Sequence, residues 1–267
     1  MNYLVIKCGG SVLERLPQSF YKNIAELHQK GICKPVIVHG GGPLISSLLT
    51  KLGVNTTFED GLRVTTKEVL NVVEMVLSGS VNKQIVESLQ KVGGNAYGIS
   101  GVDGALLQAA PTTSAEKLGF VGEVVQVKTK LIDQILDQDF IPVISPVGID
   151  REGQKYNING DVAASAVAQA LGAKLCFISD IPGIYAEKNG VTKTFHELSQ
   201  SEAESLIEQE VITGGMIPKV RAAIDGLTHN VDQVVILNGM ETNSITHFLE
   251  GKKIGTKMIA DREMYHV

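Results

Sequence analysis

Glycine-rich loops that follow short apolar runs are the residues of this sequence with the clearest chemical potential. The run 36–39 leads into three glycines and Pro43, and Lys7 is followed closely by Gly9 and Gly10. Glycine lets the backbone approach a ligand and point its N–H groups at it, and a helix N-terminus beyond the loop adds partial positive charge. Together the loops predict a site for a phosphate or a carboxylate. Either loop by itself is equally consistent with a tight turn from strand to helix.

Charged side chains lie beside these loops. Lys7 and Lys219 each neighbour a glycine pair, and Arg63 follows Gly61. A single lysine at a strand end is usually just solvated, but two lysines beside two glycine loops favour a shared anion site. The planar fork of Arg63 suits a carboxylate. Asp161 is either an ordinary acid in the first turn of a helix or a residue that orients nearby cations.

Other kinds of site lack their motifs. G-x-x-x-x-G-K-[ST] is absent, and G-x-G-x-x-G does not follow the first apolar run, so neither a Walker A loop nor a dinucleotide fingerprint is predicted. The three cysteines, Cys8, Cys33 and Cys176, form no C-x-x-C pair, and no histidine lies within four residues of them. A structural zinc site is therefore not expected.

Composition excludes several classes of partner. The chain has 267 residues, of which 43% are hydrophobic and 20% charged, with a net charge of −5 and no block of like charges. A nucleic-acid partner is not expected, because phosphate binding requires a basic face. No apolar stretch approaches the ~18 residues of a membrane-spanning helix, and the N-terminus does not resemble a signal peptide. These features predict a cytoplasmic protein with no membrane partner.

Strands alternate with helices along the chain. The expected strands cover 3–7, 35–39, 141–145, 175–179, 233–237 and 256–260. The expected helices cover 18–30, 44–52, about 65–91 with a possible interruption at Gly79, 161–171 and 217–227. Capping-box spacings occur at Thr65 and Glu68 and at Ser201 and Glu204. Hairpins are expected over 119–127 and over 147–158.

This alternation predicts an α/β fold whose mostly parallel central sheet is covered on both faces. Ligands of such sheets bind beyond the carboxyl ends of the strands, which is where the glycine loops lie. A soft boundary near Gly172 divides the chain into residues 1–172 and 173–267.

The motifs resemble the amino-acid kinase family, and within it most closely the kinases of N-acetyl-L-glutamate, over nearly the whole chain. The motifs that carry the resemblance are IKCGGS (6–11), VIVHGGGP (36–43), GLRVT (61–65), YNINGD (156–161), ISDIPGIY (178–185) and TGGMIPKV (213–220). The resemblance implies an open three-layer α/β/α sandwich. It also implies an N-terminal lobe that binds the acyl amino acid and dimerises, and a C-terminal lobe that binds the nucleotide.

The implied reaction is ATP-dependent phosphorylation of the γ-carboxylate of N-acetyl-L-glutamate, a step of arginine (ornithine) biosynthesis. Mg²⁺ would arrive on the nucleotide, without a metal site of the protein. The implied catalytic residues are Lys7, Lys219 and Asp161, with Asp161 positioning both lysines. The implied substrate-binding residues are Gly41, Gly42, Arg63, Asn157 and Asn159, with Arg63 on the α-carboxylate. The implied nucleotide-binding residues are Gly9, Gly10, Asp180, Ile181, Pro182, Gly183, Ile184, Tyr185, Val211, Ile212 and Thr213.

The resemblance further implies a symmetric homodimer built through the N-terminal half and not inhibited by arginine, because no long N-terminal helix precedes the first strand. The helical stretch 67–91 is the candidate interface, since Val69, Val72, Val73 and Val76 form an apolar stripe. Alternatively, this stripe packs on the sheet of its own subunit.

Three other functions remain open from the residues. A sister kinase would act on N-acetyl-aminoadipate, carbamate, aspartate or glutamate. A catalytically silent nucleotide-binding regulator is disfavoured by the joint presence of Lys7, Asp161 and Lys219. An oxidoreductase on a doubly wound sheet is disfavoured by the missing dinucleotide fingerprint.

Overall fold

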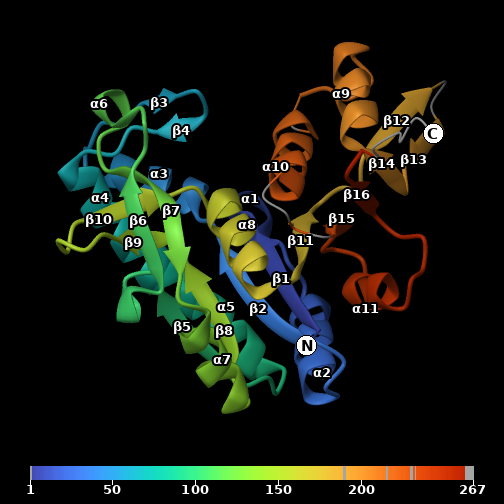
Figure 1. The fold of residues 1–267 in the computed structure, drawn as a ribbon, viewed down its shortest axis with the longest axis horizontal. Coiled ribbons are helices and arrows are strands. Elements are labelled where there is room, and N and C mark those ends of the chain that lie inside the picture. The colour runs from blue at the N-terminus through green and yellow to red at the C-terminus, as the bar shows by residue number, and fades with distance from the viewer. Residues whose placement is uncertain (1, 189–190, 215, 229–230, 232, 262–267) are drawn as a thin grey trace, which may run out of the picture.

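A mostly parallel sheet forms the centre of the molecule. The structure, a computed structural model, describes residues 2–188, 191–214, 216–228, 231 and 233–261. Within these residues eight strands pair in the order β14-β16-β15-β11-β1-β2-β8-β5 (Figure 1). Their bounds are β1 Tyr3–Cys8, β2 Lys34–His39, β5 Ala96–Ser100, β8 Ile141–Ser145, β11 Lys174–Ser179, β14 Glu197–Ser199, β15 Val234–Asn238 and β16 Thr256–Ile259. The six strands expected from the sequence are confirmed; β5 and β14 were not predicted.

The strand β1 lies near the middle of the sheet, between β2 and β11. All neighbouring pairs are parallel except β15 and β16. In the register Cys8 pairs with His39 on one side and with Ile178 on the other. The loops that follow β1, β2 and β11 therefore emerge together at one edge of the sheet, as a parallel arrangement requires.

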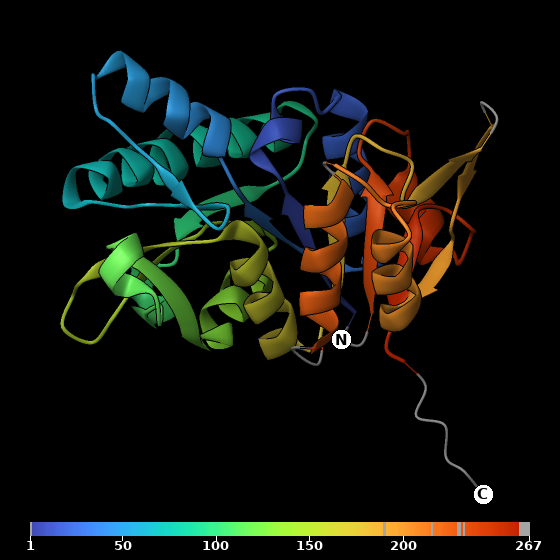
Figure 2. The ribbon, with the colours of Figure 1, turned by 90° about the horizontal axis from the view of Figure 1, so that it is seen from above.

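Helices cover both faces of the sheet, which confirms the three-layer fold. Their bounds are α1 Gly10–Leu13, α2 Gln18–Gln29, α3 Gly42–Lys51, α4 Lys67–Glu74, the π-helical η1 Met75–Val81, α5 Asn82–Lys91, the 3₁₀ turn η2 Asp103–Ala105, α6 Ala115–Leu118, α7 Thr129–Asp137, α8 Gly160–Leu171, α9 Gln200–Glu208, α10 Met216–Thr228 and α11 Ser244–Leu249. Side chains of β1 alternate between the two faces, so that Leu4 and Ile6 join one core and Val5 the other. The first core is closed by α2, α4, α5 and α11, and the second by α7, α8 and α10 (Figure 2).

The capping boxes expected at Thr65 and Glu68 and at Ser201 and Glu204 are both wrong. The side chain that caps α4 is that of Thr66, which accepts a hydrogen bond from the N–H of Val69. The capping box of α9 is formed by Ser199 and Glu202. In each case the hydroxyl of the expected cap is engaged elsewhere: that of Thr65 donates to the Arg63 carbonyl, and that of Ser201 donates to Asp261.

The stretch 67–91 is helical throughout, with the π-helical segment η1 around Gly79. Its valine stripe is buried: Val69, Val72, Val73 and Val76 are at most 4% exposed and belong to the core of their own subunit. The use of this stripe as a dimer interface is therefore wrong, and the alternative that it packs within its own subunit is confirmed.

Beside the sheet, four strands close into a small barrel that was not predicted. They are β6 Leu107–Pro111, β7 Val121–Val127, β9 Val147–Ile149 and β10 Lys155–Ile158, in the order β10-β7-β6-β9. The hairpin expected over 147–158 is confirmed as β9 and β10. The hairpin expected over 119–127 is wrong, because β7 is one continuous strand that pairs with β6 and β10. Two small hairpins complete the fold, β3 Phe58–Glu59 with β4 Leu62–Arg63, and β12 Tyr185–Lys188 with β13 Val191–Thr194.

Gly172 ends α8 in the left-handed conformation, with φ of 57°. One strand that precedes it in the chain, β1, pairs with β11, which follows it, within the same sheet. The division into lobes at this residue stays a prediction. In the part of the chain that the structure describes, no helix is both long and apolar enough to cross a membrane.

Candidate active site

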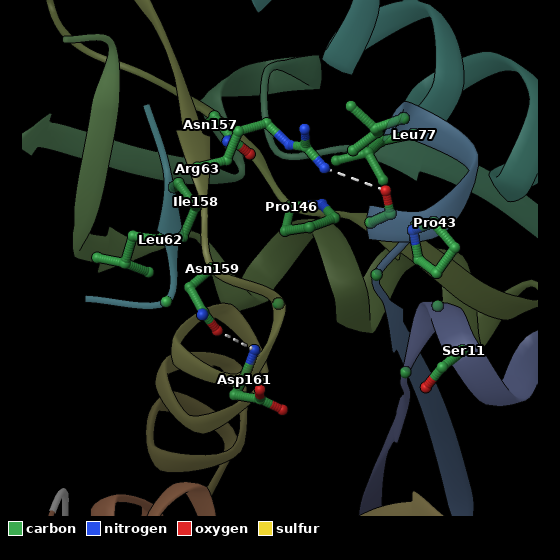
Figure 3. A pocket seen from close by; sticks show the side chains of 18 of the residues that line it. Ser11, Pro43, Leu62, Arg63, Leu77, Pro146, Asn157, Ile158, Asn159 and Asp161 are labelled. Atoms are coloured by element: carbon green, nitrogen blue, oxygen red, sulfur yellow. Dashed lines mark hydrogen bonds between the residues drawn. The ribbon is translucent and has the colours of Figure 1, made fainter. Parts of the chain in front are cut away.

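A cavity of about 330 Å³ opens at the carboxyl ends of β1 and β2. It is bounded by the loops after these strands, by the hairpin β3–β4, by the end of β10 and by the start of α8 (Figure 3). Of the residues implied by the resemblance, the following line it: Lys7, Gly9, Gly10, Gly41, Gly42, Arg63, Asn157, Asn159 and Asp161. Segments that lie far apart in the sequence are thus brought to one place.

The two glycine loops touch each other in the wall of this cavity. A Cβ on Gly10 would lie 2.9 Å from backbone atoms of Gly41 and Gly42, and a Cβ on Gly41 would lie 2.7 Å from Leu77 Cδ2. The loops need glycine because they pack against each other, in addition to making tight turns. This close contact directs the start of α3, where Gly41 offers no side-chain cap and Pro43 occupies the first turn, towards the cavity. Free N–H groups at such a helix start favour an anion.

Lys7 and Asp161, which both line the cavity, form an ion pair. Lys7 Nζ lies 2.6 Å from Asp161 Oδ1, and the Lys7 side chain is 15% exposed. Lys7 projects from the end of β1, and Asp161 lies in the first turn of α8, which packs over β1. The pairing fixes the lysine ammonium at the cavity wall.

Arg63 is held rigidly at another part of the wall. Its Nη2 donates to the Gly42 carbonyl at 3.1 Å and to Ser46 Oγ at 2.7 Å, and its Nη1 donates to Thr56 Oγ1 at 3.3 Å. Burial lowers the pKa of the guanidinium, yet an arginine stays charged in a protein. A buried, oriented cation without a carboxylate among these partners suits an incoming carboxylate.

The two asparagines of the YNINGD motif have different surroundings. Asn157 Nδ2 donates to Thr65 Oγ1 at 3.1 Å, and the same hydroxyl donates to the Arg63 carbonyl, which places Asn157 next to Arg63 (Figure 3). Asn159 Oδ1 accepts from the N–H of Asp161 at 2.7 Å and so caps α8. The Asn159 side chain therefore serves the helix start, although the residue lines the cavity.

Lys219 is held by a different acid from the expected one. Its Nζ donates to Ser179 Oγ at 2.7 Å and to Asp180 Oδ1 at 3.2 Å. The expectation that Asp161 positions both lysines is wrong in this structure, since Asp161 pairs with Lys7 and Asp180 pairs with Lys219. Asp180 follows β11 directly, and β11 neighbours β1, so the two ion pairs stand at adjacent strand ends.

The segments expected to bind the nucleotide differ in what they expose. Asp180 and Thr213 are exposed, whereas Ile184 and Ile212 are fully buried in the core. Gly183 has φ of 132° and would place a Cβ 2.7 Å from Thr256 Oγ1. The two isoleucines can therefore offer a ligand only their backbone, and their side chains anchor the segments.

His39 ends β2 and is buried without charge. Its Nδ1 lies 3.0 Å from the Gly40 carbonyl, and its Nε2 lies 3.3 Å from Asn82 Nδ2. Burial lowers the pKa of His39 to about 4. A neutral imidazole that donates to Gly40 and accepts from Asn82 satisfies both contacts, so His39 supports the glycine loop. In the described ranges no three His, Cys, Asp or Glu side chains gather to hold a metal ion.

Sequence reasoning missed the residues that hold Arg63. Phe58 pairs with Arg63 across the hairpin, and its ring lies 4.7 Å below the guanidinium carbon. A signal was available, since Asp60 and Gly61 are a D-G turn with positive φ at both residues, the pattern of a two-residue hairpin. Ser46 and Thr56 carry no comparable signal.

Known proteins resemble the chain over its whole length. The model of the amino acid kinase family matches residues 2–238. A protein of Oceanobacillus iheyensis called acetylglutamate kinase is 49% identical over 267 residues, 100% of both chains. An acetylglutamate kinase of Geobacillus kaustophilus is 51% identical over 240 residues, 90% of this chain and 91% of the relative. A crystal structure of a Streptococcus mutans protein superposes with a TM-score of 0.81 at 30% identity, covering 97% of this chain and 99% of that one. The chain therefore belongs to the amino acid kinase family.

Proposed function

We propose that this chain transfers the γ-phosphoryl group of ATP to the γ-carboxylate of N-acetyl-L-glutamate, in a step of arginine biosynthesis. The observation that carries the proposal is the cavity, where a buried arginine, a paired lysine and glycine N–H groups meet at strand ends. Full-length similarity to proteins called acetylglutamate kinase supports the choice of substrate.

The acyl amino acid is anchored by its α-carboxylate. Arg63 donates hydrogen bonds to this carboxylate, because its guanidinium is already oriented by Gly42, Ser46 and Thr56. Asn157 and the backbone of Gly41 and Gly42 bind the rest of the molecule. The γ-carboxylate then points towards Lys7.

Transfer needs positioning and charge stabilisation rather than a general base, since a carboxylate is ionised at pH 7. A γ-carboxylate oxygen attacks the γ-phosphorus, the bond from that phosphorus to the bridging oxygen breaks, and ADP leaves with the electron pair. Lys7, Lys219 and the amides of Gly9 and Gly10 stabilise the charge on the moving phosphoryl group. The substrate is MgATP, whose ion neutralises the β- and γ-oxygens. The segments 180–185 and 211–213 bind the nucleotide in this proposal.

The proposal includes a homodimer built through the N-terminal half. The large apolar side chains that stand exposed among the described residues support it, because all of them lie before Gly172: Ile32, Leu52, Phe58, Met75, Tyr97 and Val125. Twofold assemblies are the commonest soluble oligomers.

The test is ATP turnover with a panel of acids, with hydroxylamine present to trap an acyl phosphate. The panel contains N-acetyl-L-glutamate, N-acetyl-aminoadipate, carbamate, aspartate and glutamate. N-acetyl-L-glutamate should give the highest kcat/KM and a trapped hydroxamate. A higher kcat/KM with another member of the panel would overturn the choice of substrate.

A further inference from the structure

The carboxylate of Asp180 is shared between two cations. Asp180 Oδ1 accepts from Lys219 at 3.2 Å, and Asp180 Oδ2 accepts from Arg15 Nη1 at 3.0 Å. Each oxygen thus has a cation of its own. Arg15 has no place in the site described so far, and it lies 165 positions from Asp180 in the sequence.

The backbone that carries Arg15 is fixed against the sheet. Val12 and Leu13, just before it, are buried. Leu16, just after it, packs with Ile178 against Gly239, where a Cβ would lie 2.6 Å from Leu16 Cδ2 and 2.5 Å from Ile178 Cγ2. Arg15 therefore emerges from a packed segment directly beside the end of β11, which Asp180 follows.

Lys219 has two tasks that compete for one ammonium group. In the structure this ammonium donates one hydrogen bond to Ser179 Oγ and one to Asp180 Oδ1. In phosphoryl transfer it must direct donors at the phosphoryl oxygens, and this weakens its bonds to Asp180. A carboxylate that loses its cation beside an incoming polyphosphate repels that polyphosphate.

We propose that Arg15 is a positioning residue that keeps the Asp180 carboxylate neutralised and in place while Lys219 turns towards the transferring phosphoryl group. The inference rests on the proposed function. Arg15 acts through Asp180 and does not touch the reacting atoms. Its contact with Asp180 Oδ2 leaves Oδ1 as the pivot about which the lysine ammonium can move.

The expected size of the effect of removing Arg15 follows from the solvent exposure of the Arg15–Asp180 ion pair. The Arg15 side chain is 63% exposed and that of Asp180 is 33% exposed. Pairs of this kind are coupled only weakly, by about a factor of two to five in an equilibrium constant. The effect should shrink as salt screens the pair.

The first test compares Arg15→Gln with Lys22→Gln, which removes the same charge from a side chain that is 66% exposed. At low salt, Arg15→Gln should lower kcat about two- to five-fold, with an unchanged KM for the acyl substrate. Lys22→Gln should stay at the parent value, and Arg15→Lys should recover part of the loss. In an Asp180→Asn background, Arg15→Gln should have no further effect. An equal loss in both backgrounds, or no loss in either, would overturn the proposal.

A second readout does not depend on which acid is phosphorylated, or on turnover at all. The hydrogen bond from Lys219 is the largest cause that lowers the pKa of Asp180, and the charge of Arg15 lowers it by a smaller amount. The ¹³C-carboxyl titration of Asp180, assigned with Asp180→Asn, should therefore move to higher pH in Arg15→Gln and not in Lys22→Gln. If the titration of Asp180 does not move in Arg15→Gln, the proposed role of Arg15 is wrong even if the kinase activity is as proposed. If it moves in a protein that phosphorylates none of the acids, the proposed function fails while the Arg15–Asp180 coupling stands.

Discussion

Single side chains in this site are defined by their partners more than by their type. Arg63 illustrates this, because three neutral acceptors and an aromatic ring orient it in the cavity wall. Lys7 and Lys219 are both lysines at strand ends, yet each is held by a different aspartate. The first three predictions belong to this scale.

Arg63→Lys should separate substrate anchoring from nucleotide binding. Lysine keeps the charge but loses the planar fork, so the KM for N-acetyl-L-glutamate should rise about ten-fold or more, while the KM for ATP stays within about two-fold. The exposed Arg151→Lys serves as control. A rise in the KM for ATP that exceeds the rise in the KM for N-acetyl-L-glutamate would assign Arg63 to the nucleotide site.

Lys7→Ala and Lys219→Ala should each lower kcat by about 100-fold, the scale of a lost electrostatic donor. The exposed Lys51→Ala, on α3, should leave kcat unchanged. The kcat values of the parent protein and the three variants are measured by steady-state kinetics with both substrates saturating. Near-normal turnover in both lysine variants would contradict their assignment to the transferring group.

His39 should make the folded state less stable in mild acid. Its pKa is about 4 in the fold, against an ordinary 6.5, so between these values the unfolded chain binds the proton that the folded chain excludes. The contribution of neutral His39 to the free energy of unfolding is complete above about pH 6.5 and declines as the pH falls towards 4. Between pH 7.5 and 5 the free energy of unfolding should fall by about 2 kcal/mol through this group.

Urea unfolding at the two pH values measures this difference. His39→Gln should remove it, whereas the partly exposed His247→Gln should retain it. An unchanged pH dependence in His39→Gln would assign the acid sensitivity to other groups.

At the scale of elements, the helical stretch from α4 to α5 supports the glycine loop of the cavity by packing against it. The side chain of Leu77, in η1, lies against Gly41 and lines the cavity. The valines that precede it are core residues. The helix thus links packing to the position of the glycine loop.

Val73→Ala should therefore destabilise the protein by about 2 kcal/mol, because Val73 is 0% exposed and its truncation leaves a cavity. Asn71→Ala, on the exposed face of the same helix, should change stability by less than about 0.5 kcal/mol. Chemical denaturation compares the two. Equal losses of stability in the two variants would mean that Val73 is not packed in the core as the structure shows.

At the scale of the whole molecule, one sheet runs through both halves of the chain and gathers the site at one edge. The large apolar side chains that are exposed among the described residues lie in the first half of the chain. Light scattering should therefore give twice the mass of the 28.6-kDa chain. A mass equal to one chain at micromolar concentration would contradict the proposed homodimer.

The sequence by itself determined the strands of the sheet centre and the glycine loops, and the resemblance carried by its motifs named nine of the residues that line the cavity. Apolar runs and strand-to-helix turns are local patterns, and parallel strands bring their carboxyl ends together whatever the details of packing. Local patterns could not choose between neighbouring caps such as Thr65 and Thr66.

Only the tertiary structure decided how the charged residues pair. It placed Asp180 rather than Asp161 on Lys219, added Arg15, closed the barrel of β6, β7, β9 and β10, and pressed Gly10 against Gly41. These contacts join residues that are distant in the sequence. They depend on the path of the whole chain, which no local propensity contains.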